Sequence, residues 1–128
     1  MKDRGKQSLY ASGEDYLEAI LVLKKQKGMV RSVDVARHMG VSKASVTRAT
    51  TILRKDGFLK MDREHYIYLT SAGRVTAEKI YERHTVLTKL LTQLGVDAAI
   101  AAEDACKIEH VISDESFERL KAAAKPES

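Results

Sequence analysis

The sequence predicts a mainly α-helical fold, in which a winged helix-turn-helix of three helices and a β-hairpin precedes a second, helical half. Apolar residues recur every three or four positions over most of the chain, which is the spacing of amphipathic helices. The run His65–Leu69 is rich in strand-forming residues and follows the polar turn Asp62-Arg63-Glu64, so one hairpin is expected between the helices. The only proline is Pro126, and the seven glycines fall near the ends of periodic segments, so no helix interior is expected to be broken.

The first half contains three expected helices and two expected strands. Residues 1–11 are polar and are expected to be loose. Gly28 ends the first helix, Gly40-Val41 makes the turn between the second and third, and Ser42 caps the third. The expected helices cover residues 14–26, 32–39 and 43–55, and the expected strands cover residues 58–61 and 65–69. The side chains expected to face the core on the second and third helices are Val33, Ala36, Met39, Val46, Ile52 and Leu53.

The second half contains three further helices. Thr70-Ser71 caps a long helix that reaches Leu94, Gly95 breaks that helix, and Ser113-Asp114 caps the last one. The two helices after Gly95 are expected over residues 97–112 and 115–123. The apolar stripes expected in this half are Ile80, Leu87, Leu91 and Leu94 on the long helix, and Ala101, Ala105, Ile108 and Ile112 on the next.

Charge is distributed unevenly along the 128 residues. Residues 1–74 carry 15 Lys and Arg against 8 Asp and Glu, a net of +7, whereas residues 75–128 have a net of −3. A basic first half suits a polyanionic partner, although a well-solvated surface would have the same composition. The chain shows no signal peptide and no apolar run near the ~20 residues that span a bilayer, so no membrane partner is expected. The single cysteine suits a reducing cytoplasm, where a thiol can bind metal.

The exposed face of the third predicted helix indicates DNA binding. It combines small, hydroxyl-bearing and basic side chains, which allow close approach to a major groove and can bond phosphates or base edges. The wing could place Lys60 and Arg63 against the DNA backbone. A winged helix used only for protein contacts is the alternative. The residues predicted to bind DNA are Lys43, Ser45, Thr47, Arg48, Thr51, Arg54 and Arg63.

A second set of residues indicates a transition-metal site. Cys106, Glu109 and His110 have the spacing i, i+3, i+4, so a helix places all three on one face, adjacent to the core stripe. His84 lies in the middle of the apolar stripe of the long helix, where a histidine is more often a core residue than a ligand. Glu103, one turn before Cys106, could be a further ligand or a solvated charge.

Two acids on the first predicted helix are further candidates. Asp15 and Glu18 lie one turn apart. Asp15 also completes Ser12-Gly13-Glu14-Asp15, a capping-box pattern, and Glu18 could be a surface charge. Ligand-like groups on three helices together favour a metal site more than any one of them alone.

Four passages carry a resemblance to a known family. They are Glu14-Asp15-Tyr16-Leu17-Glu18-Ala19-Ile20, the turn and third helix with Ser45-Val46-Thr47, Leu69-Thr70-Ser71-Ala72-Gly73, and Ala105-Cys106-Lys107-Ile108-Glu109-His110-Val111-Ile112-Ser113-Asp114. From Ser12 to about Leu120 the chain resembles the diphtheria toxin repressor family of metal-dependent repressors, which includes the manganese transport regulators. The resemblance implies a DNA-binding domain over residues 1–72, a helical metal-binding and dimerisation domain over residues 73–128, and a homodimer that represses metal-uptake genes at a palindromic operator.

The resemblance also implies a ligand set with metal bound between the two domains. Asp15 and Glu18 match the acidic first-helix ligands of the manganese-type members. His84 matches the histidine of the long helix, and Glu109 and His110 match the Glu-His pair shared across the family.

Cys106 matches a position where manganese-type members use glutamate and iron-type members use cysteine. A thiolate favours Fe(II), Co(II) or Zn(II), whereas carboxylates favour Mn(II), so Fe(II) or Mn(II) is expected, with Co(II) and Zn(II) possible. The ancillary ligands of iron-type members would fall at Thr88 and Ala102, neither of which replaces a ligand well. The chain ends at residue 128, so the SH3-like third domain of longer members is not expected.

The expected mechanism is a switch in which metal fixes the spacing of two recognition helices on DNA. One alternative is a metal-independent winged-helix regulator, in which the histidines and the cysteine would fill the core. The other is a metalloenzyme in which the metal activates water, but no catalytic base is evident outside the ligands, so no enzymatic activity is expected.

Overall fold

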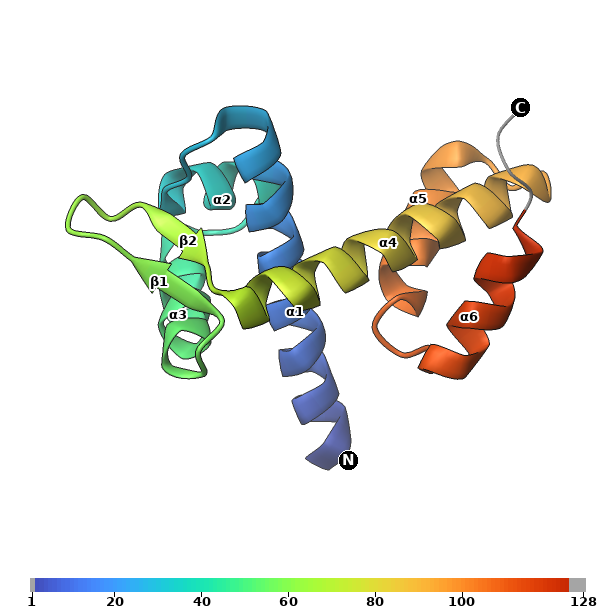
Figure 1. Ribbon diagram of the computed structural model, residues 1–128, viewed down its shortest axis with the longest axis horizontal. Coiled ribbons are helices and arrows are strands. Elements are labelled where there is room, and N and C mark those ends of the chain that lie inside the picture. Colours follow the sequence, from blue (N-terminus) through green and yellow to red (C-terminus); the bar gives the residue numbers. More distant parts are fainter. Residues whose placement is uncertain (1, 125–128) are drawn as a thin grey trace. The chain divides into compact units, whose positions relative to one another are not determined.

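The computed structural model describes residues 2–124, with side chains from Gly13 onward (Figure 1). These residues form two compact units, Met1–Glu78 and Lys79–Ser128. The element order confirms the predicted winged helix-turn-helix followed by helices. The elements are α1 (Lys2–Lys27), α2 (Ser32–Met39), α3 (Lys43–Lys55), β1 (Leu59–Met61), β2 (Ile67–Leu69), α4 (Ser71–Gln93), α5 (Ala98–Ile108) and α6 (Asp114–Ala123). None of the helices, over the described residues, is long and apolar enough to cross a membrane.

Helix α1 begins at Lys2 rather than at Glu14, so the prediction that residues 1–11 are loose was wrong from residue 2 onward. The segment holds Lys, Arg, Gln and Ala without proline, and these residues favour a helix. Gly13 therefore lies inside a helix, where a single glycine weakens the helix without ending it. Asp15 also lies well inside α1, so the predicted capping box is not formed.

The core of the first unit is built on α1 and receives α2 and α3. Leu17 and Ile20 of α1 are fully buried, and Val35 and Val46 pack against them. The prediction that Val33 and Ile52 face the core was wrong, because both side chains are exposed. Val35 takes the inward position on α2, and on α3 the buried residues Val46, Thr50 and Leu53 are spaced by four and three, which leaves Ile52 off the stripe.

The helix-turn-helix is closed at both ends of its turn. Gly40 ends α2 with φ of 68°, a left-handed conformation that glycine adopts without strain. Its N–H and that of Val41 both donate to the Ala36 carbonyl. Ser42 then caps α3, because its Oγ accepts the N–H of Ser45 at 3.0 Å. The predicted turn and cap are confirmed, and they fix the direction in which α3 leaves α2.

The wing consists of the antiparallel strands β1 and β2. The paired residues are Leu59 with Leu69, Lys60 with Tyr68, and Met61 with Ile67. The second strand begins at Ile67 rather than His65, which has φ of 69° and belongs to the turn. Asp62 organises that turn: its carboxylate accepts the N–H groups of Glu64 and Tyr66 and the hydroxyl of Tyr68. The Tyr66 N–H, together with the other donors, lowers the pKa of Asp62 from its ordinary value.

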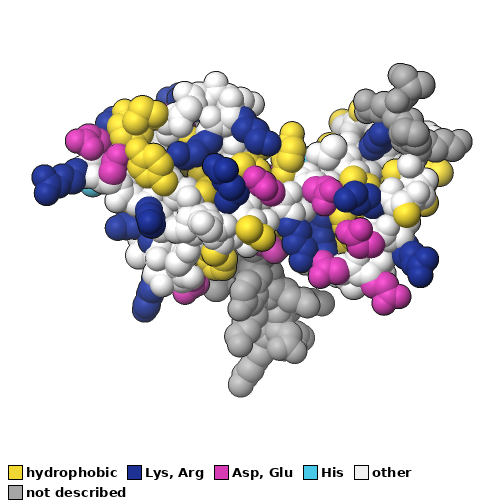
Figure 2. Space-filling view, viewed as in Figure 1, with side chains coloured by type: hydrophobic (Ala, Val, Ile, Leu, Met, Phe, Trp, Pro, Cys, Tyr) yellow, Lys and Arg dark blue, Asp and Glu magenta, His cyan; other side chains and the backbone are white. Residues whose placement is uncertain are grey.

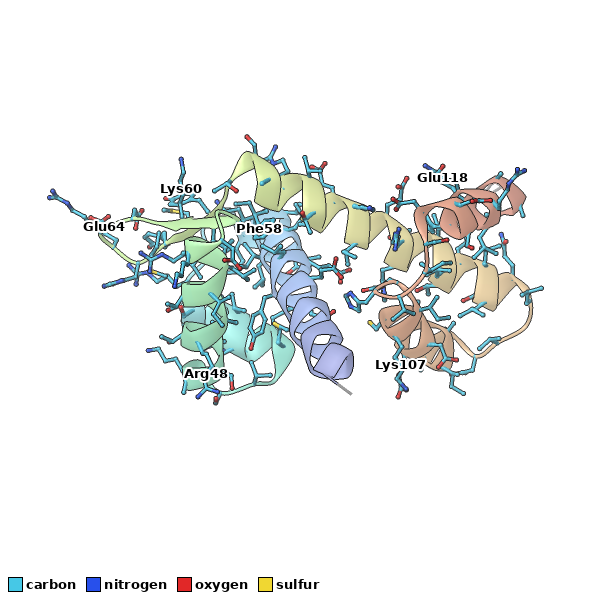
Figure 3. All side chains as sticks on the ribbon, turned by 90° about the horizontal axis from the view of Figure 1, so that it is seen from below. Arg48, Phe58, Lys60, Glu64, Lys107 and Glu118 are labelled. Carbon is cyan, nitrogen blue, oxygen red and sulfur yellow. The ribbon has the colours of Figure 1, made fainter. Side chains whose placement is uncertain are left out.

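We expect Asp62→Ala to loosen the wing in a pH-dependent way. The pKa of Asp62 is lowered in the folded chain, so its carboxylate stabilises the fold above the unfolded value of about 3.9, and that contribution disappears as the pH falls through the lower folded value. Hydrogen exchange of the Glu64 and Tyr66 amides at neutral pH should therefore accelerate in the variant. Glu64→Ala, at the wing tip, is the control (Figure 3). Equal exchange in wild type and Asp62→Ala would show that the carboxylate does not hold the turn.

Helix α4 begins where the wing ends. Thr70 connects the two, because its hydroxyl donates to the Gly57 carbonyl at 2.6 Å and accepts the Gly73 N–H at 3.1 Å. In the second unit the buried face of α4 carries Ile80, Arg83 and Leu87. Leu94, predicted to continue this stripe, is 79% exposed because α4 ends at Gln93.

Helices α5 and α6 pack in the second unit through small and aromatic residues. Ala101 and Ala105 of α5 and Phe117 of α6 are buried. Helix α5 ends at Ile108, four residues earlier than predicted, and Ser113 caps α6 by accepting the Ser116 N–H. The turn between the two helices therefore contains His110 and places Glu109 at the C-cap of α5.

Candidate metal centre and DNA interface

The second unit brings together three of the predicted metal ligands. Nδ1 of His84, on α4, lies 2.9 Å from Oε2 of Glu109 and 3.6 Å from Sγ of Cys106. One ligand atom from each of the three residues lies within 4.8 Å of the others. Two ligands bound to one ion at about 2.0–2.3 Å are about 3–4 Å apart in a tetrahedral site, so these separations are of the right scale. We call this group, His84, Cys106 and Glu109, the helical cluster.

Glu109 is the most deeply placed member of the helical cluster. Its side chain is completely buried, since it continues the four-residue spacing of Ala101 and Ala105. The prediction that the α5 ligands would all avoid the core face was therefore wrong for Glu109. A buried carboxylate is costly unless both oxygens are satisfied. Oε1 accepts no hydrogen bond from any described residue, although Nε2 of His110 lies 3.6 Å away.

The donor set fits a divalent transition metal. The imidazole of His84, the thiolate of Cys106 and the carboxylate of Glu109 are ligands that borderline ions such as Fe(II), Co(II) and Zn(II) take. Cys106 is exposed and His84 is partly exposed, so an ion can reach the helical cluster from solvent. An ion could bind the buried Oε1 of Glu109, which accepts no hydrogen bond from any described residue.

Three further acids were candidate ligands, two on α1 and one on α5. Asp15 and Glu18 are both half-buried on α1 of the first unit, one turn apart. Glu103 is exposed on α5, and among the described residues it is not part of a group of ligand atoms close enough to hold an ion. The structure thus unites the candidates of α4 and α5, and it describes those of α1 only within their own unit.

Helix α3 presents its six predicted DNA-binding residues to solvent, and Arg63 of the wing is exposed as well. The exposed side chains include the basic Arg48, which Figure 3 labels on α3. The hydroxyls of Thr47 and Thr51 donate to the carbonyls of Lys43 and Thr47 within the helix. Because their protons are used, these threonines can offer DNA an acceptor oxygen or a methyl group, and a methyl suits contact with thymine. The exposed residues from the predicted set are Lys43, Ser45, Thr47, Arg48, Thr51, Arg54 and Arg63.

A shallow groove separates α3 from the first wing strand, and one of its cations, Lys55, was not predicted from the sequence to contact DNA. Lys55 is one turn after Thr51 on α3, and Lys60 lies on β1 (Figure 3). The four-residue spacing from Thr51 is the sequence signal that could have identified Lys55. The groove is lined by Thr51, Arg54, Lys55, Leu59, Lys60 and Met61. Figure 2 shows Lys and Arg side chains spread over this unit, on the face drawn.

Two domain families match the chain and together account for most of it. Residues 8–66 match the family described as iron dependent repressor, N-terminal DNA binding domain. Residues 70–125 match the family described as iron dependent repressor, metal binding and dimerisation domain. An uncharacterised HTH-type transcriptional regulator of Methanocaldococcus jannaschii is 36% identical over 110 residues, which are 84% of this chain and 88% of the relative.

Solved structures of metal-dependent regulators share the fold. The manganese regulator SloR is 28% identical to this chain, and the two structures superpose with a TM-score of 0.78. The match covers 87% of this chain and 52% of SloR. IdeR of T. acidophilum is 26% identical with a TM-score of 0.75 and 86% of this chain covered. A manganese-dependent transcriptional repressor in complex with manganese is 25% identical with a TM-score of 0.79 and 88% covered. The chain spans about half the length of these three proteins.

Proposed function

The chain belongs to the iron-dependent repressor family, and from that premise we propose that it is a transcriptional repressor whose affinity for DNA is raised by a divalent metal ion. The observation that carries the proposal is the helical cluster, whose buried carboxylate keeps one oxygen without a hydrogen bond from any described residue. The exposed, basic and hydroxyl-bearing face of α3 supports the DNA-binding half of the proposal. The family comprises transcriptional regulators, so we propose no enzymatic activity.

We propose six ligands in all, contributed by both domains. His84, Cys106, Glu109 and His110 would come from the helical domain, residues 73–128. Asp15 and Glu18 would come from the DNA-binding domain, residues 1–72. Their assignment as ligands rests on the sequence resemblance. A bound metal would supply positive charge for these carboxylates and the thiolate to share.

The chain's own residues explain why metal would matter for DNA binding. Without positive charge, Asp15 and Glu18 would repel the carboxylate of Glu109, and the two domains would sample many relative orientations. In a homodimer, two α3 helices must lie about one turn of DNA apart to bind a palindromic operator. Restricting the orientation should strengthen DNA binding by about 5–150-fold, a typical coupling between two sites.

Fe(II) and Mn(II) are the two physiological ions that we propose, and the targets would be genes for metal uptake. The thiolate of Cys106 favours Fe(II), whereas the carboxylates of Asp15, Glu18 and Glu109 favour Mn(II). A DNA partner and an exposed cysteine thiol both suit a cytoplasmic location.

The first test is a metal titration of the anaerobic, full-length chain with Mn(II), Fe(II), Co(II) and Zn(II). We expect micromolar or tighter binding, and a thiolate-to-Co(II) absorption band that Cys106→Ala abolishes. Replacing Cys106 should also weaken binding at least tenfold, because a first-sphere ligand is lost. A chain that binds none of the four ions would be a metal-independent winged-helix regulator.

The second arm measures DNA binding with and without the metal that binds best. Duplexes selected from a random pool should be retained more strongly by the metal-loaded chain. We expect Arg48→Ala to lower DNA affinity and reduce its dependence on salt, because a groove-facing cation is removed. Arg119→Ala removes the same charge from the exposed face of α6 and serves as the matched control. Equal DNA binding by the metal-free and metal-loaded chain would refute the switch.

A further inference from the structure

Arg83 occupies a buried position that an apolar residue would ordinarily take. It lies on α4 between Ile80 and Leu87, and the spacings of three and four place all three on one face. Only 5% of Arg83 is exposed. Burying a guanidinium is unfavourable unless its donors find acceptors, so the contacts of this side chain reveal its role.

The guanidinium of Arg83 binds the segment that leaves α5. Its Nη1 donates to the backbone carbonyls of Glu109, at 3.1 Å, and Ile112, at 2.7 Å. Its Nη2 donates to the carboxylate of Asp114, at the start of α6. The ring of Phe117 lies 5.4 Å from Cζ and covers one face of the group. One side chain therefore connects both ends of the turn between α5 and α6.

These contacts explain why α5 ends at its metal-ligating residues. In a continued helix the Glu109 carbonyl would accept the N–H of Ser113, four residues later. Arg83 takes that carbonyl instead, and Ser113 caps α6. A cation at the C-terminal end of a helix also interacts favourably with its dipole.

Glu109 is consequently held by two consecutive residues of α4. His84 hydrogen-bonds its carboxylate at 2.9 Å, and Arg83 hydrogen-bonds its backbone carbonyl. Because the carbonyl and the side chain share one Cα, fixing the peptide limits the directions in which the carboxylate can point. The same restraint extends to His110, which lies between the two carbonyls that Arg83 binds.

We propose that Arg83 is a positioning residue for the metal centre: by binding the Glu109 and Ile112 carbonyls, it holds the Glu109 carboxylate and the His110 imidazole in the orientation that an ion requires. This inference rests on the proposed function. In this role Arg83 does not bind the ion itself; it acts through the backbone carbonyls of Glu109 and Ile112. Residues that orient ligands in this way typically change metal affinity by 10–100-fold when they are replaced.

The test replaces Arg83 by lysine in the full-length chain. Lysine keeps the charge, but its single ammonium lacks the planar fork that reaches two carbonyls and a carboxylate. We expect Co(II) affinity to fall at least tenfold and the Co(II) absorption spectrum to change. In the metal-free chain, the amides of Val111 and Ile112, which both donate to the Ile108 carbonyl, should exchange at least tenfold faster.

Lys79→Met is the matched control. Lys79 also pairs with Asp114, at 2.9 Å, but neither of the Arg83-bound carbonyls is among its partners, so this variant should keep wild-type affinity and spectrum. If Arg83→Lys has a lower melting temperature but wild-type Co(II) affinity and spectrum, the side chain is merely structural and the inference is overturned. If Arg83→Lys does not fold, Asp114→Asn replaces it: a two- to fivefold loss of affinity supports the inference, and unchanged affinity overturns it. Failure of the wild-type chain to bind Co(II) would instead overturn the proposed function.

Discussion

Replacing Glu109 by glutamine is expected to leave the metal-free chain at least as stable as wild type and to abolish tight metal binding. The side chain is completely buried, and its Oε1 accepts no hydrogen bond from any described residue. An amide of the same shape removes a buried charge, so the free energy of unfolding in the presence of a chelator should stay equal or rise, by about 1–3 kcal/mol. Because glutamine is a poor ligand, metal affinity should fall at least 100-fold. Thermal melts with and without Co(II) measure both effects.

The combination of unreduced stability without metal and lost metal binding distinguishes a ligand from a core residue. At a metal concentration of about 100 times the Kd, wild type should gain about 2.7 kcal/mol of stability, and the variant almost none. Glu103→Gln, an exposed acid on the same helix, is the matched control and should behave as wild type. If Glu109→Gln binds Co(II) with wild-type affinity, the ion does not use this carboxylate. If it unfolds in the absence of metal, the carboxylate has a structural role.

Gly73→Ala is expected to be the most destabilising substitution in the first unit. A Cβ at Gly73 would lie 2.0 Å from the carbonyl oxygen of Phe58 and 3.0 Å from its carbonyl carbon. The clash is with backbone, so the start of α4 and the strand β1 would have to separate. The Thr70 hydrogen bonds to Gly57 and Gly73 would then be strained. We expect a loss of about 3–5 kcal/mol, at the upper end of single substitutions, visible as a lower urea midpoint.

Gly13→Ala provides the comparison. Gly13 also lies inside a helix, and a Cβ there would meet only Leu53 Cδ2, at 3.6 Å, an ordinary contact. Alanine favours a helix over glycine by about 0.5–1 kcal/mol, so this variant should be as stable as wild type or more stable. If both glycine variants unfold at the same urea concentration, the close approach at Gly73 does not constrain the wing.

The sequence alone was sufficient to predict the architecture and to name the candidate ligands that the structure brings together in the helical cluster. The helix-turn-helix could be predicted because its determinants are local: Gly40 for a left-handed turn and Ser42 for a cap. The exposed face of α3 follows from its periodicity. The spacing of Cys106 and Glu109 likewise depends only on helical geometry, so these residues could be named before their partner His84 was placed beside them.

Errors in the predicted elements arose where a local pattern allowed more than one outcome. Ser12-Gly13-Glu14-Asp15 has the composition of a capping box, yet α1 continues through it because the preceding residues also favour a helix. Val33 and Ile52 are apolar residues on helices that bury other positions. Periodicity indicates that a helix has a buried face, but a short helix leaves the direction of that face uncertain by a residue or two.

Only the tertiary structure decided the surroundings of the proposed metal ligands. The buried state of Glu109, the end of α5 at Ile108 and the role of Arg83 all depend on hydrogen bonds between α4 and residues 25 to 31 positions later. Sequence spacing identified Ile80 and Leu87 as core residues, and Arg83 lies on the same stripe, but its partners could not be read from a local pattern. A buried charge is tolerated only where distant acceptors meet it, and the chain's path in three dimensions alone brings them there.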